Sequence, residues 1–166
     1  MKKDLGIIFG LFLLIVVLLV FGQSYSTIGF ITGGQNQSQT RKGMTTVSAK
    51  TLIVDAEVVS RASDRKEGLS DRESLLLNQG MLFVFENEGS YGIWMKDMKF
   101  AIDIIWIDED KKIVDIVINA APQPGKKDKE LTIYKPRSDA MYVLEVNAGL
   151  VSLHNLQIDD KVNFEL

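Results

Sequence analysis

The sequence lacks cysteine altogether and has a single histidine, His154. Without cysteine the chain cannot build a disulfide framework, a thiolate zinc site, a CxxC redox motif or the lipidated cysteine of a lipoprotein. With one histidine it cannot build a histidine-rich metal centre either. We therefore expect no metal site and no other cofactor.

An excess of charge of one sign is also missing. The 166 residues include 19 lysines and arginines against 22 aspartates and glutamates, and the basic residues form no stripe. Proteins that bind the phosphate backbone usually show such a stripe. Nucleic acid is therefore not an expected partner.

One long hydrophobic run is present, at residues 5–22 (LGIIFGLFLLIVVLLVFG). At about 1.5 Å per residue, it is long enough to cross the hydrocarbon core of a bilayer. Lys2 and Lys3 precede the run, and the positive-inside rule then leaves the N-terminus cytoplasmic. We predict that residues 1–22 form a single-pass anchor in the cell membrane, with the rest of the chain extracytoplasmic.

A cleaved signal peptide is the alternative, because both kinds of segment begin alike, and cleavage would leave the remainder secreted. Gly22-Gln-Ser24 is a poor match to a small-x-small cleavage site. Residues 23–46 are rich in Gly, Ser, Thr and Gln and are predicted to be a flexible linker. Residues 47–166 remain as one folded domain, long enough to bury a core.

Short strands dominate the pattern of this domain. In the segment 51–59, Leu52, Val54 and Ala56 recur at every second position, as in a strand with one buried face. Charged residues between 108 and 112 separate two apolar runs and indicate a hairpin. The predicted strands are 51–59, 81–85, 100–107, 113–118, 141–146 and 161–164.

Helical signals are fewer. Ser70 and Glu73 have the spacing of a capping box, which predicts a short helix over 71–80. Residues 150–156 are expected to form a short helix or turn, and 119–138 form a loop that contains all three prolines. The predicted fold class is mainly β, a β-rich α+β domain: a compact antiparallel sandwich or barrel with one or two short helices.

Asp103 stands inside the apolar run 100–107, where large hydrophobic residues alternate on both faces of the predicted strand. An unpaired carboxylate buried there would cost several kcal/mol, on the order of the general penalty for buried charge. Arg65 and Arg72 are its expected partners, because a guanidinium can pair with both carboxylate oxygens. Lys96 and the backbone amides of a nearby loop are the alternatives.

A family resemblance emerges from five short motifs taken in order. They are Arg65-x-x-Gly68-Leu69-x-x-Arg72-x-x-Leu75, Gly80-Met-Leu-Phe-x-Phe85, Trp94-Met-Lys96, Ile102-Asp-Ile104, and Leu144-Glu145 followed by Gly149. Together they resemble the DUF192 family, from about Leu52 to Phe164. The resemblance implies a compact β-rich fold, often behind a signal or membrane segment. It implies no mechanism, because that family has no established activity.

The chain departs from this family pattern at one informative place. It has Trp94-Met-Lys-Asp97-Met98 where the family usually has Trp-Met-Lys-Asn-Thr. Asp97 adds a charge beside Lys96, so if an asparagine amide at this position binds a ligand in the family, this chain offers a carboxylate in its place.

The candidate site collects charged and aromatic residues from several of these motifs. The hypothesis is that they converge on one pocket floored by Trp94 and Met95, with Glu145 and Asp103 facing it together. The candidate ligand-binding residues are Arg65, Arg72, Trp94, Met95, Lys96, Asp97, Asp103 and Glu145.

Three functions follow from this site and from the predicted anchor. The first is a non-enzymatic, membrane-anchored module that binds a small ligand, an envelope polymer or an envelope protein. The second is a hydrolase or lyase acting on an envelope component, with Asp103 or Glu145 as acid or base. The third is a structural accessory of a membrane complex, since Gly6 and Gly10 have GxxxG spacing for close helix packing.

Overall fold

The structure, a computed structural model, describes residues 43–166. Its strands are β1 (Met44–Ala49), β2 (Leu52–Val59), β3 (Gln79–Gly89), β4 (Ile93–Trp94), β5 (Ile102–Ile107), β6 (Ile113–Ala120), β7 (Ile133–Tyr134) and β8 (Ala140–Asn147). Its helices are α2 (Ala62–Glu67), the 3₁₀ turn η2 (Asp128–Glu130) and α3 (Leu150–Leu153). The domain is therefore rich in strands, as the sequence predicts.

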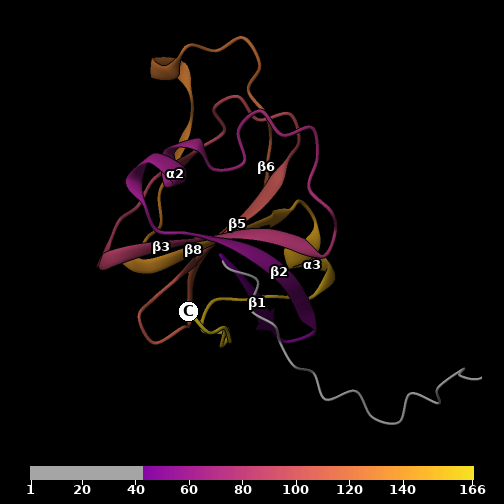
Figure 1. Cartoon of the computed structure of the whole chain (residues 1–166), viewed down its shortest axis with the longest axis vertical. Helices are drawn as coiled ribbons and strands as arrows, with labels where there is room; N and C mark the ends of the chain where they lie inside the picture. Colours follow the sequence, from indigo (N-terminus) through magenta and orange to yellow (C-terminus); the bar gives the residue numbers. More distant parts are fainter. Residues whose placement is uncertain (1–42) are drawn as a thin grey trace, which may run out of the picture. The chain divides into compact units, whose positions relative to one another are not determined.

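Six strands form one mixed sheet in the order β1-β2-β3-β8-β5-β6, and β4 pairs with β7 apart from it. In Figure 1, β3, β8 and β5 cross the middle of the molecule, and the segment that carries η2 projects away from the sheet. The pair β2 and β3 is parallel, while the other pairs in the sheet are antiparallel.

The prediction of an antiparallel sandwich or barrel is therefore wrong in its details. The sheet is mixed, and β1 and β6 are its two edges, so it does not close into a barrel. The predicted closing strand at 161–164 forms only isolated bridges, which join Ser48 to Asn163 and Lys112 to Lys161. The C-terminal segment thus bridges the two edges without a continuous ladder.

A hydrophobic cluster covers each face of the sheet, because β5 and β8 place apolar side chains on both faces. One cluster includes Leu144 and Val146 and is covered by Leu150 and Val151 of α3. The other includes Val143, Ile104 and Trp106, and residues from connecting segments cover it, namely Leu69, Leu75, Met95 and Met98. All six residues of β5 are buried, as its two-sided apolar pattern predicts.

The helix predicted over 71–80 is absent, and the helical pattern upstream of it ends at Gly68, which is the C-cap of α2. The Ser70 hydroxyl does not cap a helix, because it donates a 2.9 Å hydrogen bond to the carbonyl of Lys96. The side-chain amide of Asn147 donates 3.0 Å hydrogen bonds to the carbonyls of Leu75 and Leu76. These tertiary contacts hold the segment in an irregular path, as part of the crossover that a parallel β2–β3 pair requires.

The predicted linker 23–46 also needs correction at its end, because β1 begins at Met44. Thr45 is buried there, and its hydroxyl donates a 2.6 Å hydrogen bond to the carbonyl of Glu165. The rest of the linker and the predicted anchor 1–22 lie outside the described residues. Between residues 43 and 166, no helix is long and apolar enough to span a membrane.

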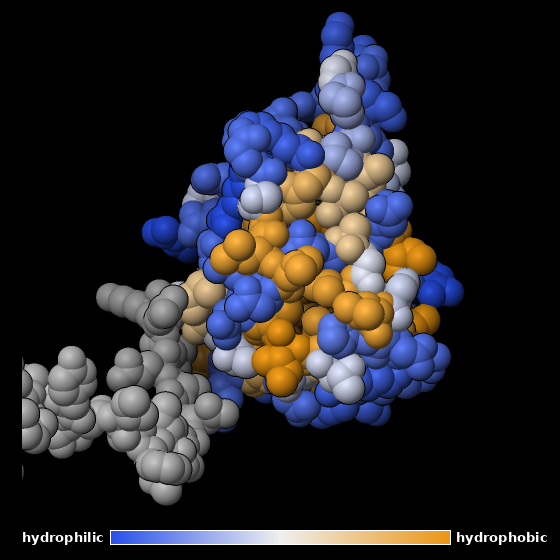
Figure 2. Space-filling model, turned by 90° about the vertical axis from the view of Figure 1, so that its right-hand side faces the viewer, coloured by the Kyte–Doolittle hydropathy of each residue, from blue (hydrophilic) through white to orange (hydrophobic). Residues whose placement is uncertain are grey.

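One face of the molecule keeps exposed apolar groups. Figure 2 shows them gathered in the middle of that face with polar groups around them. Leu76, Leu77 and Leu153 are more than half exposed, at 63%, 74% and 74%. The bonds from Asn147 hold the segment before Leu77 beside the end of β8, just ahead of α3, so these leucines belong to neighbouring parts of the fold.

Candidate ligand-binding site

Glu145 lies in the middle of β8, and its neighbours in the sheet are Met81 on β3 and Ile104 on β5. Strand alternation turns its side chain to the face where Val143 packs, so the carboxyl group stands among apolar side chains. Glu145 is only 5% exposed. The Glu145 carboxyl group thus lies in the hydrophobic cluster that includes Val143, Ile104 and Trp106.

No hydrogen bond or ion pair with another residue in 43–166 satisfies this carboxyl group, and the group opens into a pocket. Burial raises the pKa of Glu145 to about 8, and the charge of Arg72 opposes that rise only in part. At neutral pH the group is therefore mainly protonated. It can donate a hydrogen bond when protonated and accept several when ionised.

The Glu145 pocket has a volume of about 60 Å³, which is room for several water molecules or one small organic group. Its floor comes from the strands β3, β5 and β8, and its walls come from the C-terminal end of α2 and from β4. The lining residues are 65–70, Phe83, 92–94, Met98, Ile102 and Glu145. Apolar side chains therefore surround one buried carboxyl group, with charged groups at the α2 side.

Arg65 and Arg72 are both engaged elsewhere. The Arg72 guanidinium makes a bidentate pair with Glu57, with N–O distances of 2.6 and 2.9 Å. This hydrogen bond lowers the pKa of Glu57 and raises that of Arg72. The Arg65 guanidinium donates to the carbonyls of Ser60 and Val84 and lies 4.7 Å from the centre of the Phe85 ring. Neither arginine pairs with Asp103, so that prediction is wrong.

Backbone amides, the alternative expected from the sequence, are the partners of Asp103. Its carboxylate accepts N–H groups from Asn119 at 2.8 Å, and from Gly149 and Val151 at 2.9 Å each. A bulge between β5 and β6 presents the amide of Asn119, which has a φ of +53°. Gly149 has a φ of +93° and turns the chain into α3. As a result, the amides of Gly149 and Val151 point at Asp103.

Asp103 and Glu145 therefore do not share a pocket. Asp103 pairs in register with Val146, the neighbour of Glu145, so the two carboxyl groups point to opposite faces of the sheet. The hypothesis of a joint acid and base pair is wrong for this reason. Asp103 belongs to the framework that attaches α3 to the sheet.

The remaining predicted residues split between two neighbouring pockets. Arg65 and Trp94 line the Glu145 pocket, whereas Met95, Lys96 and Asp97 line a second, more polar pocket with residues 123–126 of the proline-containing loop. Lys96 forms an ion pair with Asp128 of that loop, and its ammonium lies 5.9 Å from the centre of the Trp94 ring. Met98 lines both pockets. The Trp94 region and the proline-containing loop thus meet at this second pocket.

Several lining residues were not among the candidates. Phe83 and Ile102 come from β3 and β5, and their only sequence signal is a position on the same strand face as Met81 and Ile104. The residues 68–70 follow α2 and pack onto the Trp94 segment. The amide of Asp71 donates a 2.9 Å hydrogen bond to the carbonyl of Asp97. No pattern in the sequence predicts this hydrogen bond between Asp71 and Asp97.

Fold and site together define a β-rich domain with one mixed sheet and a small pocket, lined by both polar and apolar groups, over a buried carboxyl group. The chain belongs to the DUF192 family, described as "Uncharacterized ACR", whose model matches residues 44–164. The match begins at β1 and confirms the family resemblance that the motifs indicate.

Relatives of the chain include UPF0127 proteins of two archaea. The protein of Thermococcus sibiricus is 25% identical over 92 residues, and that of Thermococcus gammatolerans is 28% identical over 92 residues. Each match covers 54% of this chain and 54% of the relative. The chain thus spans about half the length of the curated relatives it matches.

Two solved structures are similar in fold. A protein of Sinorhizobium meliloti 1021, described as a candidate transcription regulator, has a TM-score of 0.64 at 27% identity and covers 73% of this chain and 92% of its own. A protein of unknown function from Novosphingobium aromaticivorans has a TM-score of 0.62 at 24% identity, covering 72% and 83%. The second likeness concerns the fold alone.

Proposed function

We propose that this chain is a membrane-anchored, extracytoplasmic binding module of the cell envelope, and that the Glu145 pocket is its small-ligand site. The observation that carries the proposal is the Glu145 carboxyl group, 5% exposed and without a partner in the described chain, at the base of the pocket. No oxygen of this group is sealed away without a partner, so the pocket, rather than another residue, supplies its hydrogen-bond partner, which can be water or a ligand.

The shape and chemistry of the pocket support the same proposal. Small-ligand sites are concave and mainly apolar, with a few polar groups that fix orientation. Here Trp94, Phe83, Met98 and Ile102 supply apolar surface, and Glu145 supplies the oriented polar group. The walls are held by tertiary bonds from Ser70 and Asp71 to the Trp94 segment, so the site is formed before a ligand arrives.

Binding is tested on the full-length protein in nonionic detergent, by thermal unfolding against small molecules and fragments of envelope polymers. We expect compounds that raise the melting temperature of wild type and of Glu86→Gln but not of Glu145→Gln. Glu86 is the matched control because it is exposed on β3 and does not line the pocket. If a compound stabilises Glu145→Gln as much as wild type, it binds at a site other than the Glu145 pocket, which contradicts the proposal.

The anchor and the extracytoplasmic location rest on the apolar run 5–22 and the lysines before it. Because the chain has no cysteine, single cysteine variants report topology without background. In intact cells, a membrane-impermeant maleimide should label Ser152→Cys, which is exposed on α3, but not Lys2→Cys. Labelling of neither variant before lysis would contradict the proposed orientation.

The enzymatic alternative now depends on Glu145 alone, because Asp103 faces the other side of the sheet. A carboxyl group with a pKa near 8 suits a general acid at neutral pH, which is the observation that favours this reading. The two functions separate on one variant. If the Glu145→Gln variant still binds a compound but no longer turns it over, the chain is an enzyme. If the variant loses affinity for the compound and wild type shows no turnover, the chain is a binding module.

A further inference from the structure

Resting on the proposed function, we infer that the Glu145 pocket binds a small organic cation. The positively charged nitrogen of the ligand pairs with the Glu145 carboxylate, and its apolar body lies against Trp94, Phe83 and Met98. The inference follows from the charges around the pocket, from its lining and from the burial of the carboxyl group.

The first step concerns the charges that surround Glu145. On the sheet, its neighbours in β3 and β5 are apolar, namely Met81, Phe83, Ile102 and Ile104. The pocket-lining charged groups on the α2 side are Arg65, Lys66 and Glu67, and Arg72 lies close enough to affect Glu145 electrostatically. These are the charged groups that a cation at Glu145 would encounter.

The second step is that neither arginine is free to neutralise Glu145. Arg72 is held by both oxygens of Glu57, and Arg65 is held by the carbonyls of Ser60 and Val84. Lys66 and Glu67 are exposed and of opposite sign, so their long-range effects largely cancel. An ionised Glu145 therefore has no directly bonded counter-charge within the described chain, although Arg72 acts on it from a distance, and a cationic ligand would provide a direct one.

The third step concerns the lining. Aromatic side chains attract cations through the electron-rich faces of their rings, most strongly in the case of tryptophan. Trp94 and Phe83 line the pocket together with the polarisable thioether of Met98. An anionic group placed against Glu145 would be repelled by the ionised carboxylate, and the cations of the lining, Arg65 and Lys66, stand at the α2 side of the pocket. The lining thus favours a cationic head group on an apolar body.

The fourth step is a pH dependence that follows from linkage. The pKa of free Glu145 is about 8, so a cation that pairs with the ionised group displaces a proton at lower pH. The ionised fraction rises from about 1% at pH 6 to about 50% at pH 8, which predicts about a 50-fold gain in affinity for a ligand that stays charged. A neutral ligand that accepts a hydrogen bond from protonated Glu145 would weaken over the same range.

The test uses three probes of one shape, benzylammonium, benzyl alcohol and benzoate, and the full-length protein in nonionic detergent. Affinities are measured by isothermal titration calorimetry at pH 6 and pH 8. We expect benzylammonium to bind about 50-fold more tightly at pH 8, and to bind at least tenfold more tightly than either other probe. Glu145→Gln should weaken it at least tenfold at pH 8 and remove the pH dependence. Glu86→Gln, which removes an exposed carboxylate outside the pocket, should stay within about twofold of wild type.

Each other outcome overturns the inference in a distinguishable way. If benzyl alcohol binds as well as benzylammonium and both need Glu145, the pocket is a ligand site for neutral donors and only the cation class fails. If no probe binds while a compound from the thermal screen still depends on Glu145, the cation class again fails alone. If benzylammonium binds equally to wild type and Glu145→Gln, it binds outside the pocket. Trp94→Ala, which leaves the carboxyl group intact, should weaken benzylammonium as well, so a folding defect in one variant does not decide the result.

Discussion

Two buried carboxyl groups lie on adjacent, paired strands of the same sheet and have opposite surroundings. Asp103 on β5 is fully buried, and its carboxylate accepts three backbone amides. Glu145 on β8 is 5% exposed, meets no partner in the described chain and opens into a pocket. The two carboxyl groups point to opposite faces of the sheet. One face supplies backbone amides as hydrogen-bond donors, and the other supplies a pocket.

The comparison shows that burial alone does not separate a framework residue from a site residue. A carboxylate that accepts several backbone N–H groups is stable as an anion and leaves no oxygen for a ligand. A carboxyl group without such bonds destabilises the folded state when it ionises, and the cost is reduced when a ligand binds. The predictions below change one group at a time, from the largest expected effect to the smallest.

The largest effect is expected for Glu145→Gln, as a gain in stability that depends on pH. The folded-state pKa of about 8 lies above the ordinary value of 4.5, so the favourable contribution of the protonated group is complete below 4.5 and is lost as pH rises through 8. Between pH 5 and pH 8, wild type should lose roughly 4 kcal/mol relative to the variant. Denaturant unfolding at several pH values measures the difference, and a constant difference would mean that Glu145 is ionised throughout.

Asp103→Asn should have the opposite sign and a somewhat smaller size. The new amide can accept on one side only, so its NH₂ group would face either the amide of Asn119 or the amides of Gly149 and Val151. We expect a loss of about 3 kcal/mol at neutral pH, because buried donors are left without an acceptor. Denaturant unfolding measures the loss, with Asp139→Asn as an exposed control. A loss no larger than that of the control would remove Asp103 from the framework.

The strands could be predicted from the sequence more fully than the connections between them. Alternation in β2 and the two-sided apolar pattern in β5 follow directly from which faces are buried. The parallel pairing of β2 and β3 does not, because local periodicity carries no information on strand direction. The capping box at Ser70 failed because the hydroxyl bonds a carbonyl of Lys96, which lies far along the chain.

The site, too, could be predicted only as far as local sequence patterns reach. Glu145 and Trp94 were among the candidates because both stand in the sequence motifs, and Glu145 is a carboxyl group within an otherwise apolar strand. Whether Asp103 and Glu145 face one pocket depends on the register between β5 and β8, in which Asp103 opposes Val146. A shift of one residue in that register would reverse the answer, and no local signal fixes it.

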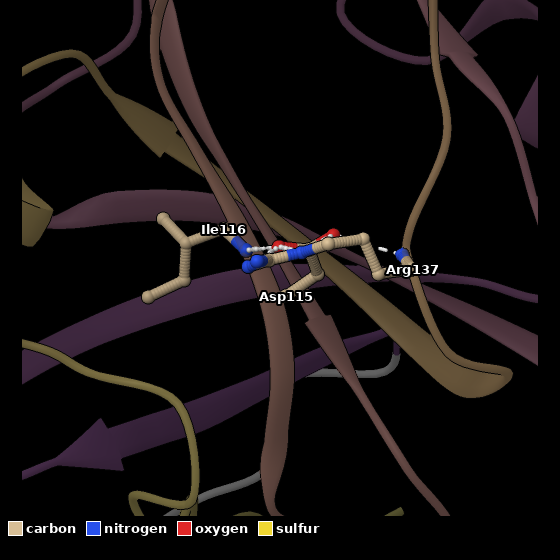
Figure 3. A network of polar contacts seen from close by, with 3 residues as sticks. All are labelled: Asp115, Ile116 and Arg137. Atoms are coloured by element: carbon tan, nitrogen blue, oxygen red, sulfur yellow. Dashed lines mark hydrogen bonds and ion pairs between the residues drawn. The ribbon is translucent and has the colours of Figure 1, made fainter.

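Asp115 is a third buried carboxylate, and it extends the comparison to an ion pair. Figure 3 shows the Arg137 side chain lying along the Asp115 carboxylate. The distance from Nη2 of Arg137 to Oδ1 is 2.7 Å, and the amides of Arg137 and Ile116 donate at 2.8 and 2.9 Å. These bonds, first of all the one from the Arg137 side chain, lower the pKa of Asp115. They attach the segment before β8 to β6.

Asp115→Asn should cost about 2 kcal/mol, less than Asp103→Asn, because Arg137 is 72% exposed and water can replace it. The stabilisation is present above the ordinary pKa of 3.8 and is lost as pH falls through the lowered value. Denaturant unfolding at pH 7 and below pH 4 should therefore show the difference between wild type and variant shrinking in acid. A difference that is the same at both pH values would contradict the ionic contribution.

The smallest effect on stability, and the sharpest test of the comparison, is expected for Arg72→Met. Its pair with Glu57 is about one third exposed and should contribute only about 0.5 kcal/mol. Yet, among residues 43–166, Arg72 is the charge that lowers the pKa of Glu145, so its removal should raise that pKa above about 8. Carboxyl-carbon NMR titration of Glu145 measures the shift, and Lys99→Met, which breaks the ion pair with Glu73, is the matched control. If the titration of Glu145 is the same in wild type and Arg72→Met, Arg72 has no electrostatic effect on the pocket, and the partial offset assigned to it is wrong.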